Sequence, residues 1–502
     1  MTRTRRPARS ATSIPQNPFG QVPRLYAPIE VLSSDQVETI HQAALKVLAT
    51  VGMRVLDGRA RGLFAAAGAL VDREMMVRFD PAMVGERLAT VPETFTLHAR
   101  NPAHNLHFGG NSMVFASVGG PAYVMDIDKG RRDGSFVEMC DYLKLIQSLN
   151  VIQQEGGGPF EPMDLNANTR HLDTYLAQIT FLDKSWQTQT LGTARTMDGL
   201  EMAAIAMGCT PQTLPPTLLG IINTNSPLQL DIPMAEGLIA LAEHGQVNTI
   251  TPFTLAGAMS PVTLAGALVQ QHAEAMAGIV LTQIVRPGVP VIYGGFTSNV
   301  DMRSGAPAFG TPEYAKAAQA SGQLARHIGV PFRSSNVTSA NAVDAQAAYE
   351  SQMALWGAVM GGAHLIEHAA GWMHGGLTAS FEKLILDAEM LQMIQSYLIP
   401  IVTDPASLAL ETIAEVGPGG HFFGTRHTMD RYERAFHSPM LSNWENYPNW
   451  LEKGSIEAPG RANVIWKQIL TEYEQPSLDL GISDALNDYV ARRKADGGAP
   501  MN

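Results

Sequence analysis

The sequence predicts an α/β protein centred on a parallel (β/α)8 TIM barrel, with an N-terminal helix, a small antiparallel sheet and a C-terminal wrapping extension. From about residue 136, short apolar runs alternate with longer helical patterns, which is typical of a parallel sheet. Gly, Asn, Ser or Thr closes most of these runs, and residues 136–403 match the roughly 250 residues of such a barrel. The alternative is a doubly wound open sheet, but "EGGGPF" after the first run is not the usual GxGxxG of that fold.

The N-terminal region divides into an arm and a small folded region. Residues 1–30 are basic and lack the apolar segment of a secretory signal, so we expect a disordered arm. The pattern "DQVETIHQAALKVLATVGMRV" predicts an amphipathic helix within 32–56, with Ser33 or Ser34 as its N-cap. Short alternating runs between 74 and 127 predict the antiparallel sheet. The N-terminal helical and small β region is therefore assigned to residues 31–135.

Seven segments are candidate barrel strands: "NVIQQEGGG", "WQTQTLGT", "TLLGIINTNS", "NTITPFTLAGA", "PVIYGGFTS", "PFRSSNVTS" and "AHLIEHAAG". Helices are expected between and after them, over 168–182, 196–208, 231–244, 261–285, 311–327, 342–361 and "TASFEKLILDAEMLQMIQSYLI". Residues 404–502 mix a helix with aromatic-rich irregular chain. We expect this C-terminal extension to wrap the barrel or to form an oligomer contact, which makes a homo-oligomer the expected assembly.

Composition narrows the class of protein. A content of 45% hydrophobic and 16% charged residues indicates a globular protein, and the net charge of −12 disfavours nucleic-acid binding. No segment is long and apolar enough for a membrane helix. The only cysteines, Cys140 and Cys209, exclude a disulfide framework and any multi-cysteine metal site. A cytoplasmic protein is the best match.

Polar and aromatic residues gather at the ends of the expected strands, where a barrel carries its chemistry. A quaternary ammonium ion would suit this set, because it donates no conventional hydrogen bond and is held by ring faces and carboxylates. Arg333 in such a place needs an anion, either a substrate carboxylate or one of Glu155 and Glu367. The candidate substrate-binding residues are His368, Arg333, Trp372, Tyr293, Phe253, Asn223, Glu155 and Glu350.

The stretch "HLIEHAAGWMHGG" over 364–376 raises the question of a metal site. His364 and His368 are four residues apart, which on a helix would make a ligand pair, but on a strand they lie near opposite ends. The HExxH pattern is absent. We therefore predict no metal, a structural His364 and a functional His368, with a carboxylate-supported zinc site as the alternative. Glu350, near a helix start, has a structural alternative: its negative charge would stabilise the positive N-terminal end of the helix dipole.

The sequence resembles the trimethylamine:corrinoid methyltransferase family. The resemblance lies in "ALKVLATVGMRV", "GGPAYVMDIDKGRRDGSFVEMCDYLKL", "VDAQAAYESQMALWGAVMGGAHLIEHAAGWMHGGLTASFEKLILDAEML" and "GHFFGTRHTMDRYE", from about residue 30 to 480. It implies a (β/α)8 barrel that passes a methyl group from an amine to the cobalt of a separate corrinoid protein. Trimethylamine enzymes of the family carry pyrrolysine at a barrel strand end, whereas "RSSNVTS" here contains ordinary residues. The chain resembles relatives without pyrrolysine, which act on quaternary amines such as glycine betaine.

The resemblance also implies how the site would work. The corrinoid belongs to a partner protein, since the chain lacks the DxHxxG cobalamin signature, and the absence of His-x-Cys argues against thiol substrates. We expect orientation of the methyl donor rather than acid–base catalysis, with His368 and Arg333 gripping a carboxylate and Trp372, Phe253 and Tyr293 forming a cation cage. Glu155 and Glu350 would balance charge. The alternatives are a metal-dependent lyase or aldolase-type barrel enzyme and a catalytically silent betaine-binding sensor.

Overall fold

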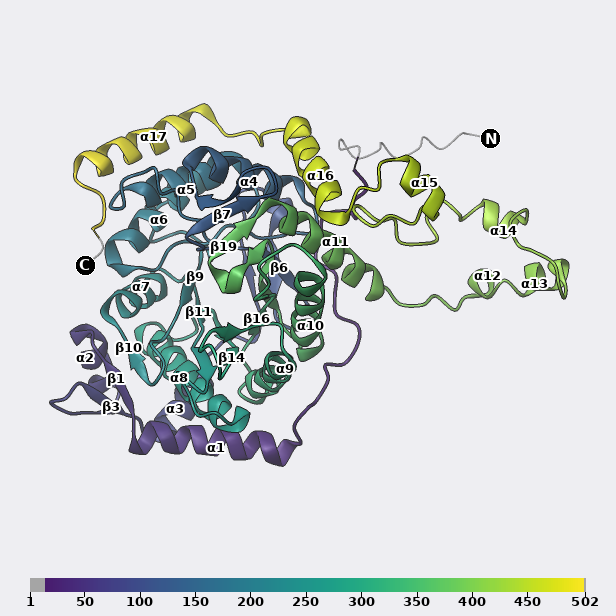
Figure 1. Ribbon diagram of the computed structural model, residues 1–502. Coiled ribbons are helices and arrows are strands. Elements are labelled where there is room, and N and C mark those ends of the chain that lie inside the picture. Colours follow the sequence, from purple (N-terminus) through teal and green to yellow (C-terminus); the bar gives the residue numbers. More distant parts are fainter. Residues whose placement is uncertain (1–13, 501–502) are drawn as a thin grey trace.

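The chain forms an α/β fold around one curved parallel sheet (Figure 1). The computed structural model describes residues 14–500. Six strands pair side by side in the order β6-β17-β16-β13-β11-β9. They are β6 (Val114–Ser117), β17 (Leu365–Ala370), β16 (Phe332–Ser335), β13 (Val291–Gly294), β11 (Val247–Ile250) and β9 (Leu219–Ile222).

Two short segments connect the outer strands β6 and β9. Ala116 makes a parallel bridge to Gln154, Gln154 to Ser185, and Gln187 to Leu219. The expected strands "NVIQQEGGG" and "WQTQTLGT" are therefore present only as isolated bridges, while the other five expected strands form ladders. The polar residues of these two segments lie between β6 and β9, at one side of the curved sheet.

Strand β6 corrects one expectation. It falls inside the stretch 74–127 that we assigned to a small antiparallel sheet, but it pairs in parallel with β17. All four of its residues are buried, whereas an antiparallel strand with one solvated face alternates between buried and exposed residues. The other strands of the stretch pair antiparallel in small sheets, partly with strands outside it: β3 (Met76–Arg78) with β1 (Met53–Val55) and β2 (Leu70–Val71), β4 (Phe95–Leu97) with β5 (Leu106–Phe108), and β7 (Tyr123–Asp126) with β8 (Gly130–Asp133).

The seven expected helices are all present around the sheet. They are α5 (Arg170–Phe181), α6 (Gly192–Met207), α7 (Ile232–Glu243), α8 (Leu264–Val285), α9 (Pro312–His327), α10 (Ala345–Gly361) and α11 (Phe381–Tyr397). A further helix, α4 (Phe136–Ser148), follows β8 and starts at a capping box on Ser135. Helix α8 is buried on nearly every side, because α1 and α3 (Pro81–Leu88) cover its outer face.

The N-terminal helix is confirmed as α1 (Ser34–Thr50), capped by Ser33. Of the disordered arm expected over 1–30, residues 1–13 lie outside the described residues. Residues 14–30 lie against the body in irregular conformation. Asn17 N donates to Gln392 Oε1 at 2.7 Å, and the buried Arg24 donates from Nη1 to the carbonyl of Ala363 at 3.2 Å. Hydrogen bonds to the body thus order a segment whose composition predicted disorder.

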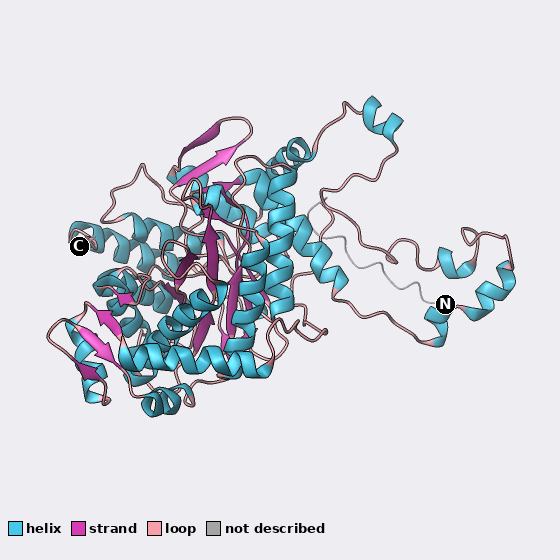
Figure 2. Cartoon of the chain, turned by 60° about the horizontal axis from the view of Figure 1, so that its bottom comes forward, coloured by secondary structure: helices cyan, strands magenta, loops and turns pink. Residues whose placement is uncertain are grey.

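Only the last section of the C-terminal extension wraps the body. Helix α16 (Ala458–Glu472) packs on α11, and α17 (Leu480–Ala495) packs on α5 and α6. Asp198 of α6 fixes α17 by accepting hydrogen bonds from Tyr489 Oη at 2.8 Å and Arg493 Nε at 2.6 Å. Most of residues 399–457 instead project away from the body as a long loop with short helices (Figure 2), apart from the buried Met440 and Leu441. Among the described helices, none is long and apolar enough to cross a membrane.

Candidate functional site

A cavity of about 680 Å³ lies at the carboxyl ends of the parallel strands. Its wall combines residues that follow different strands, among them Asn223 after β9, Thr251 after β11 and Arg333 in β16. The volume falls within the range of small-molecule sites, which is roughly 300–1,000 Å³. Ligand sites of parallel α/β sheets lie at this end of the strands, because the loops that follow them converge there.

Arg333 supplies a buried positive charge to this cavity. It is 2% exposed, and within residues 14–500 its Nε and Nη1 have no hydrogen-bond partner. Burial lowers the pKa of Arg333, and the nearby Glu367 opposes that effect. The guanidinium carbon lies 5.3 Å from the centre of the Phe296 ring. A guanidinium with free donors in a buried wall is ready to bind an anion, since leaving such donors unpaired is costly.

Glu367 is the neighbouring acid, and Gln187 holds it. Gln187 Nε2 donates to both Glu367 carboxylate oxygens at 3.0 Å. Burial raises the pKa of Glu367 to about 7, against the opposing effects of Arg333 and the Gln187 hydrogen bonds. The acid is therefore poised between its charged and neutral forms near neutral pH, and its charge responds to what occupies the cavity.

His368 faces the same cavity as Glu367, although successive strand residues normally point to opposite faces. The cause is a left-handed backbone at His368, with φ +52°, inside an irregularity of the β17–β6 pairing. Non-glycine residues rarely adopt this conformation, and it is often found at functional sites. Burial and the Arg333 charge hold the pKa of His368 well below its usual value. The lowered pKa favours the neutral ring, which can still donate one N–H to an anion in the cavity.

Aromatic rings form one wall of the cavity. Trp372 lies 4.1 Å from His368 between ring centres, and Phe296 lies 6.3 Å from Trp372 and 5.1 Å from Phe253. Trp372 Nε1 has no hydrogen-bond partner in the described chain. Gly376 packs against the indole so closely that a Cβ there would lie 2.4 Å from Trp372 Cζ2. Any larger residue at position 376 would therefore clash with the indole of Trp372.

The structure brings together five of the eight residues that we predicted for the site. Tyr293 does not line the cavity: it is fully buried, and its hydroxyl lies 3.1 Å from Gln271 Nε2 and 3.1 Å from His272 Nδ1 on α8. Its side chain therefore faces the helix layer, and Phe296, three residues on, supplies the ring of this chain segment. The five that line the cavity are Asn223, Phe253, Arg333, His368 and Trp372.

Glu155 and Glu350 lie one layer behind the cavity wall. The buried Glu155 accepts hydrogen bonds from the backbone N–H groups of Gly157 at 2.9 Å and Gly158 at 2.6 Å, so it shapes a glycine loop that lines the cavity. Burial raises the pKa of Glu155 to about 7. Glu350 accepts from the N–H of Ser339 at 2.8 Å and fixes the loop after β16. Neither contacts Arg333 directly among the described hydrogen bonds and ion pairs.

The candidate set chosen from the sequence leaves out three residues that the site depends on. Gln187 and Phe296 are polar and aromatic residues near strand ends, which is a visible signal, but nothing in their spacing indicates their partners. Glu274, in the middle of the apolar α8, is a stronger signal, because a buried acid needs a partner. Its carboxylate accepts from Ser226 Oγ at 2.7 Å and Leu228 N at 2.8 Å, which holds the cavity loop after β9.

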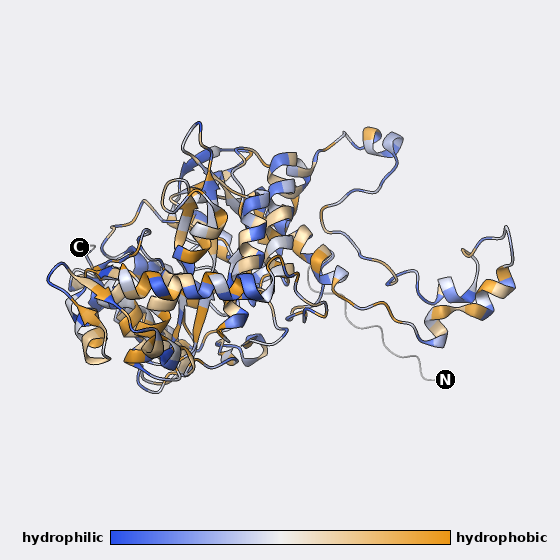
Figure 3. Ribbon diagram, turned by 90° about the horizontal axis from the view of Figure 1, so that it is seen from below, coloured by the Kyte–Doolittle hydropathy of each residue, from blue (hydrophilic) through white to orange (hydrophobic). Residues whose placement is uncertain are grey.

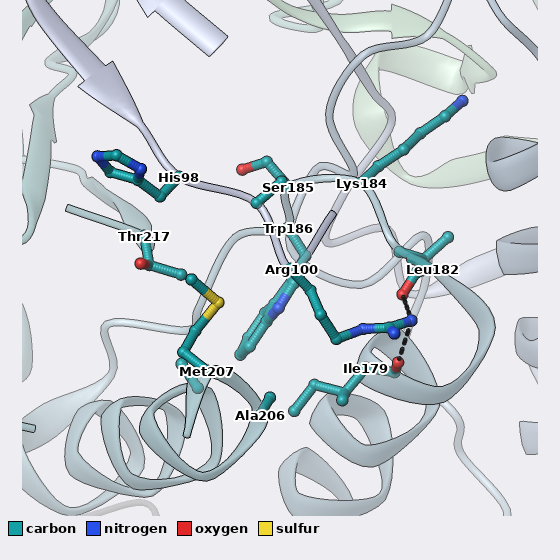
Figure 4. Close-up of a pocket in the computed structure, with 12 residues that line it drawn as sticks. His98, Arg100, Ile179, Leu182, Lys184, Ser185, Trp186, Ala206, Met207 and Thr217 are labelled. Carbon is teal, nitrogen blue, oxygen red and sulfur yellow. Dashed lines mark hydrogen bonds between the residues drawn. The ribbon is translucent and has the colours of Figure 1, made fainter. Parts of the chain in front are cut away.

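Two other candidate sites, a second cavity and a metal centre, have less support. A second cavity, lined by residues such as Arg100, Lys184 and Trp186, has a volume of only about 10 Å³, hardly room for one water (Figure 4). No group of three or more His, Cys, Asp or Glu residues in the described chain is placed to hold a metal. His364 is engaged elsewhere, since its Nδ1 accepts from Phe332 N at 2.9 Å and its Nε2 lies 3.1 Å from the carbonyl of Gly110.

Comparisons with known proteins agree over nearly the whole chain. The family described as trimethylamine methyltransferase (MTTB) matches residues 1–498. Glycine betaine methyltransferase of Desulfitobacterium hafniense (strain Y51) is 36% identical, over 93% of this chain and 98% of that protein. Trimethylamine methyltransferase MttB2 of Methanosarcina mazei is 27% identical, over 92% of this chain and 94% of that protein.

A structural neighbour is the monomethylamine methyltransferase (MtmB) of Methanosarcina barkeri. It is 9% identical, with a TM-score of 0.47, and the match covers 90% of this chain and 92% of that one. The sequence matches are the stronger ones, because they combine higher identity with a similar coverage. The chain belongs to the trimethylamine methyltransferase (MTTB) family and is a methyltransferase.

Proposed function

We propose that the protein demethylates a quaternary amine, glycine betaine, by transferring one methyl group to the Co(I) centre of a separate corrinoid protein. The proposal rests on one observation: the same cavity contains Arg333, with its free Nε and Nη1, and a wall of aromatic rings. Glycine betaine carries a carboxylate at one end and a trimethylammonium at the other. A site with a buried guanidinium and ring faces matches both ends.

Similarity among relatives supports the choice of substrate. The chain is 36% identical to a glycine betaine methyltransferase but 27% and 26% identical to the trimethylamine methyltransferases of Methanosarcina mazei and Desulfitobacterium hafniense. Trimethylamine has no carboxylate and would leave Arg333 unpaired. The higher identity and the buried guanidinium thus favour the same substrate.

The substrate is expected to bind in one orientation. Arg333 donates to the carboxylate, with His368 adding a neutral N–H donor. The trimethylammonium group lies among the rings of Phe296, Phe253 and Trp372, which attract it by cation–π interaction. When the substrate cation is present it favours the charged form of Glu367. The aromatic wall and the carboxylate then hold one methyl group toward the cavity opening.

No residue of the chain has to move a proton in this reaction. The methyl carbon–nitrogen bond breaks with its electron pair left on nitrogen, so glycine betaine leaves as the neutral amine dimethylglycine. A quaternary donor therefore needs no general acid. The chain's residues contribute orientation and exclusion of water, which together are worth roughly 7–11 kcal/mol where the geometry is ideal.

The methyl acceptor is a co-substrate, a reduced corrinoid carried by a partner protein, and supplies the nucleophile. Gly119, Gly120, Gly156 and Gly157 line the cavity without side chains, which leaves room for that approach. Glycines at a rim allow a flat macrocycle to come close to the bound methyl group. The two free thiols, Cys140 and Cys209, agree with a cytoplasmic protein.

We also infer that the curved sheet closes into a complete (β/α)8 barrel. The bridges at Gln154 and Ser185–Gln187 supply two strands between β6 and β9, which with the six laddered strands makes eight. Helices α4 to α11 then follow the eight strands in turn. A closed ring would place every strand end around one cavity.

The test is turnover by the purified protein with glycine betaine and a Co(I) corrinoid acceptor. We expect dimethylglycine and methylated corrinoid in equal amounts, and no turnover of trimethylamine. No dimethylglycine with a competent acceptor would reject the betaine assignment. Tight betaine binding without turnover, with every corrinoid protein tried, would indicate the silent sensor instead. Activity that depends on stoichiometric bound zinc or manganese would indicate the lyase or aldolase-type enzyme.

A further inference from the structure

Residues 399–457, here called the arm, leave the body after α11 and return to it at α16 (Figure 2). The arm carries four short helices, α12 (Pro405–Leu408), α13 (Leu410–Val416), α14 (Arg426–Met429) and α15 (Tyr447–Glu452). None of these four, in the described chain, has a buried residue. Isolated helices shorter than about 12–15 residues are marginal in water. The arm's helices therefore need a surface to pack on.

The arm also exposes many large apolar side chains to water. Ile401 is 88% exposed, Phe436 86%, Phe423 83% and Trp444 70%, and apolar residues recur along the whole loop (Figure 3). Single exposed apolar residues are normal, but this many large ones in one projecting segment mark an interaction surface. Large aromatic side chains are the usual anchors of such surfaces.

The root of the arm is fixed, so the arm cannot be a loose linker. Glu389 of α11 accepts hydrogen bonds from Met440 N at 2.8 Å and Ser442 Oγ at 2.7 Å. Met440 and Leu441 are buried there. The arm's returning limb is thus anchored to the body, and its apolar tip is held away from its own chain.

A second uncovered apolar surface lies on the body, next to the root of the arm. It is the outer face of α10 and α11, with exposed Tyr349 and Met353 on α10 and exposed Met393 and Tyr397 on α11. A groove of about 400 Å³ continues this helix face, lined by Val343, Asp344, Ala345, Ala348, Leu386, Glu457, Ala458, Pro459 and Ala462. Apart from Asp344 and Glu457 this lining is apolar, which suits an aromatic side chain.

We propose that the protein is a two-fold symmetric dimer in which the arm of each copy lies across the α10–α11 helix face of the other. Both surfaces belong to the same chain and emerge on the same side of it, so one reciprocal contact covers both in each copy. A second copy supplies the matching surface for each of them without any further protein. A membrane is disfavoured, because the arm has eight acidic and four Lys or Arg residues, whereas interfacial helices are rich in Lys and Arg.

The first test is the mass of the full-length protein in solution, by sedimentation at micromolar concentration. We expect twice the 54.1 kDa of one chain. The variant Phe423→Asp/Phe436→Asp changes the arm and Met353→Asp/Tyr397→Asp changes the helix face; each is expected to sediment as a single chain. The control is Leu480→Asp, an equally exposed apolar position on α17 that should leave the dimer intact.

The second test separates a reciprocal contact from misfolding. The arm variant keeps an intact helix face, and the helix-face variant keeps an intact arm, so a mixture of the two should form a heterodimer through one restored contact. The circular dichroism spectrum of each variant should match that of the wild type, and each variant should unfold in one cooperative transition, at a lower temperature than the dimer. A wild-type protein of one chain, a variant that still dimerises, or a mixture that forms no heterodimer would each overturn the proposal.

Discussion

Gln187 Nε2 donates to both carboxylate oxygens of Glu367, at 3.0 Å each. The amide fixes the position of the acid, while burial keeps its pKa near 7 in spite of Arg333 close by. A side-chain amide is a weaker partner for a carboxylate than a second cation would be. The arrangement leaves the Nε and Nη1 of Arg333 free to donate to an anion in the cavity.

The Glu367→Gln variant should change how stability depends on pH. The pKa of Glu367 is near 4.5 when unfolded and about 7 when folded, so between these values the folded chain keeps a proton that the unfolded chain releases. The free energy of unfolding of the wild type therefore falls as pH rises through this window, by on the order of 3 kcal/mol for one such group.

Urea unfolding of both proteins across this pH window measures the effect. Glu155 has the same raised pKa and should leave roughly half of the slope in the Glu367→Gln variant, with Glu155→Gln as the matched comparison. Identical slopes in wild type and Glu367→Gln would show that the buried acid is not neutral in the folded protein.

Replacing Arg333 should separate two substrates. Arg333→Met removes the donors for a carboxylate, and charge-assisted hydrogen bonds are worth about 1.5–3 kcal/mol. We expect kcat/KM for glycine betaine to fall about 10- to 100-fold, and that for choline, which has no carboxylate, to change much less. The measurement is methyl transfer with each substrate, and equal losses on both would reject the role of Arg333.

The left-handed backbone at His368 predicts an order of stabilities. A β-branched residue at φ +52° is strained by about 1–3 kcal/mol, whereas Asn tolerates this conformation. We expect His368→Val to unfold at clearly lower urea concentration than His368→Asn, with both variants impaired in betaine turnover. If the Val and Asn variants are equally stable, the backbone of β17 is regular in solution.

Trp372 should matter for binding of the cation. Its replacement by Leu keeps an apolar wall but removes the indole face, and a desolvated cation–π contact is worth about 1–2 kcal/mol. We expect the KM for glycine betaine to rise about 5- to 30-fold in Trp372→Leu. Phe309 touches Trp372, at 6.3 Å between ring centres, but lies outside the lining formed by the described residues. Phe309→Leu is therefore the control, and equal effects would contradict a direct role of the indole.

The sequence predicts the positions of the helices better than the direction in which strand side chains point. The seven helices were recognised as long runs between the short strand segments, although α8 is buried on nearly every side and has no clear amphipathic period. Tyr293 lies in β13 and Phe296 comes just after it, and only the direction of the side chain decides that Phe296 meets the cavity and Tyr293 meets α8. Alternation is interrupted at Gly294 and Gly295, so no local pattern gives that direction.

Strand β6 and the pairing of Gln187 with Glu367 were missed for a different reason. Both depend on residues more than a hundred positions apart, and a single sequence contains no signal for such pairing. A short, mostly apolar run such as β6 has the same residue pattern in a parallel and in an antiparallel sheet. Arg333 and His368 could be predicted because a buried charge and a polar residue at a strand end each demand a partner.

The contact between α1 and the body should weaken in acid. His41 Nδ1 on α1 lies 2.9 Å from His272 Nε2 on α8, and His272 Nδ1 lies 3.1 Å from the Tyr293 hydroxyl. Since that hydroxyl accepts from Gln271, it donates to His272, which in turn donates to His41 as a neutral ring. Burial holds the pKa of His272 well below 6.5, and the nearby His41 and His327 lower it further.

A histidine with a lowered folded pKa stabilises the protein above its unfolded pKa of about 6.5 and loses this contribution as pH falls below that value. We expect hydrogen exchange of the amides in α1 to speed up between about pH 6.5 and pH 5, after correction for intrinsic rates. The variant His272→Gln, which cannot be protonated, should flatten that dependence. An α1 that opens equally with acid in the wild type and in His272→Gln would mean that a group other than this histidine controls the contact.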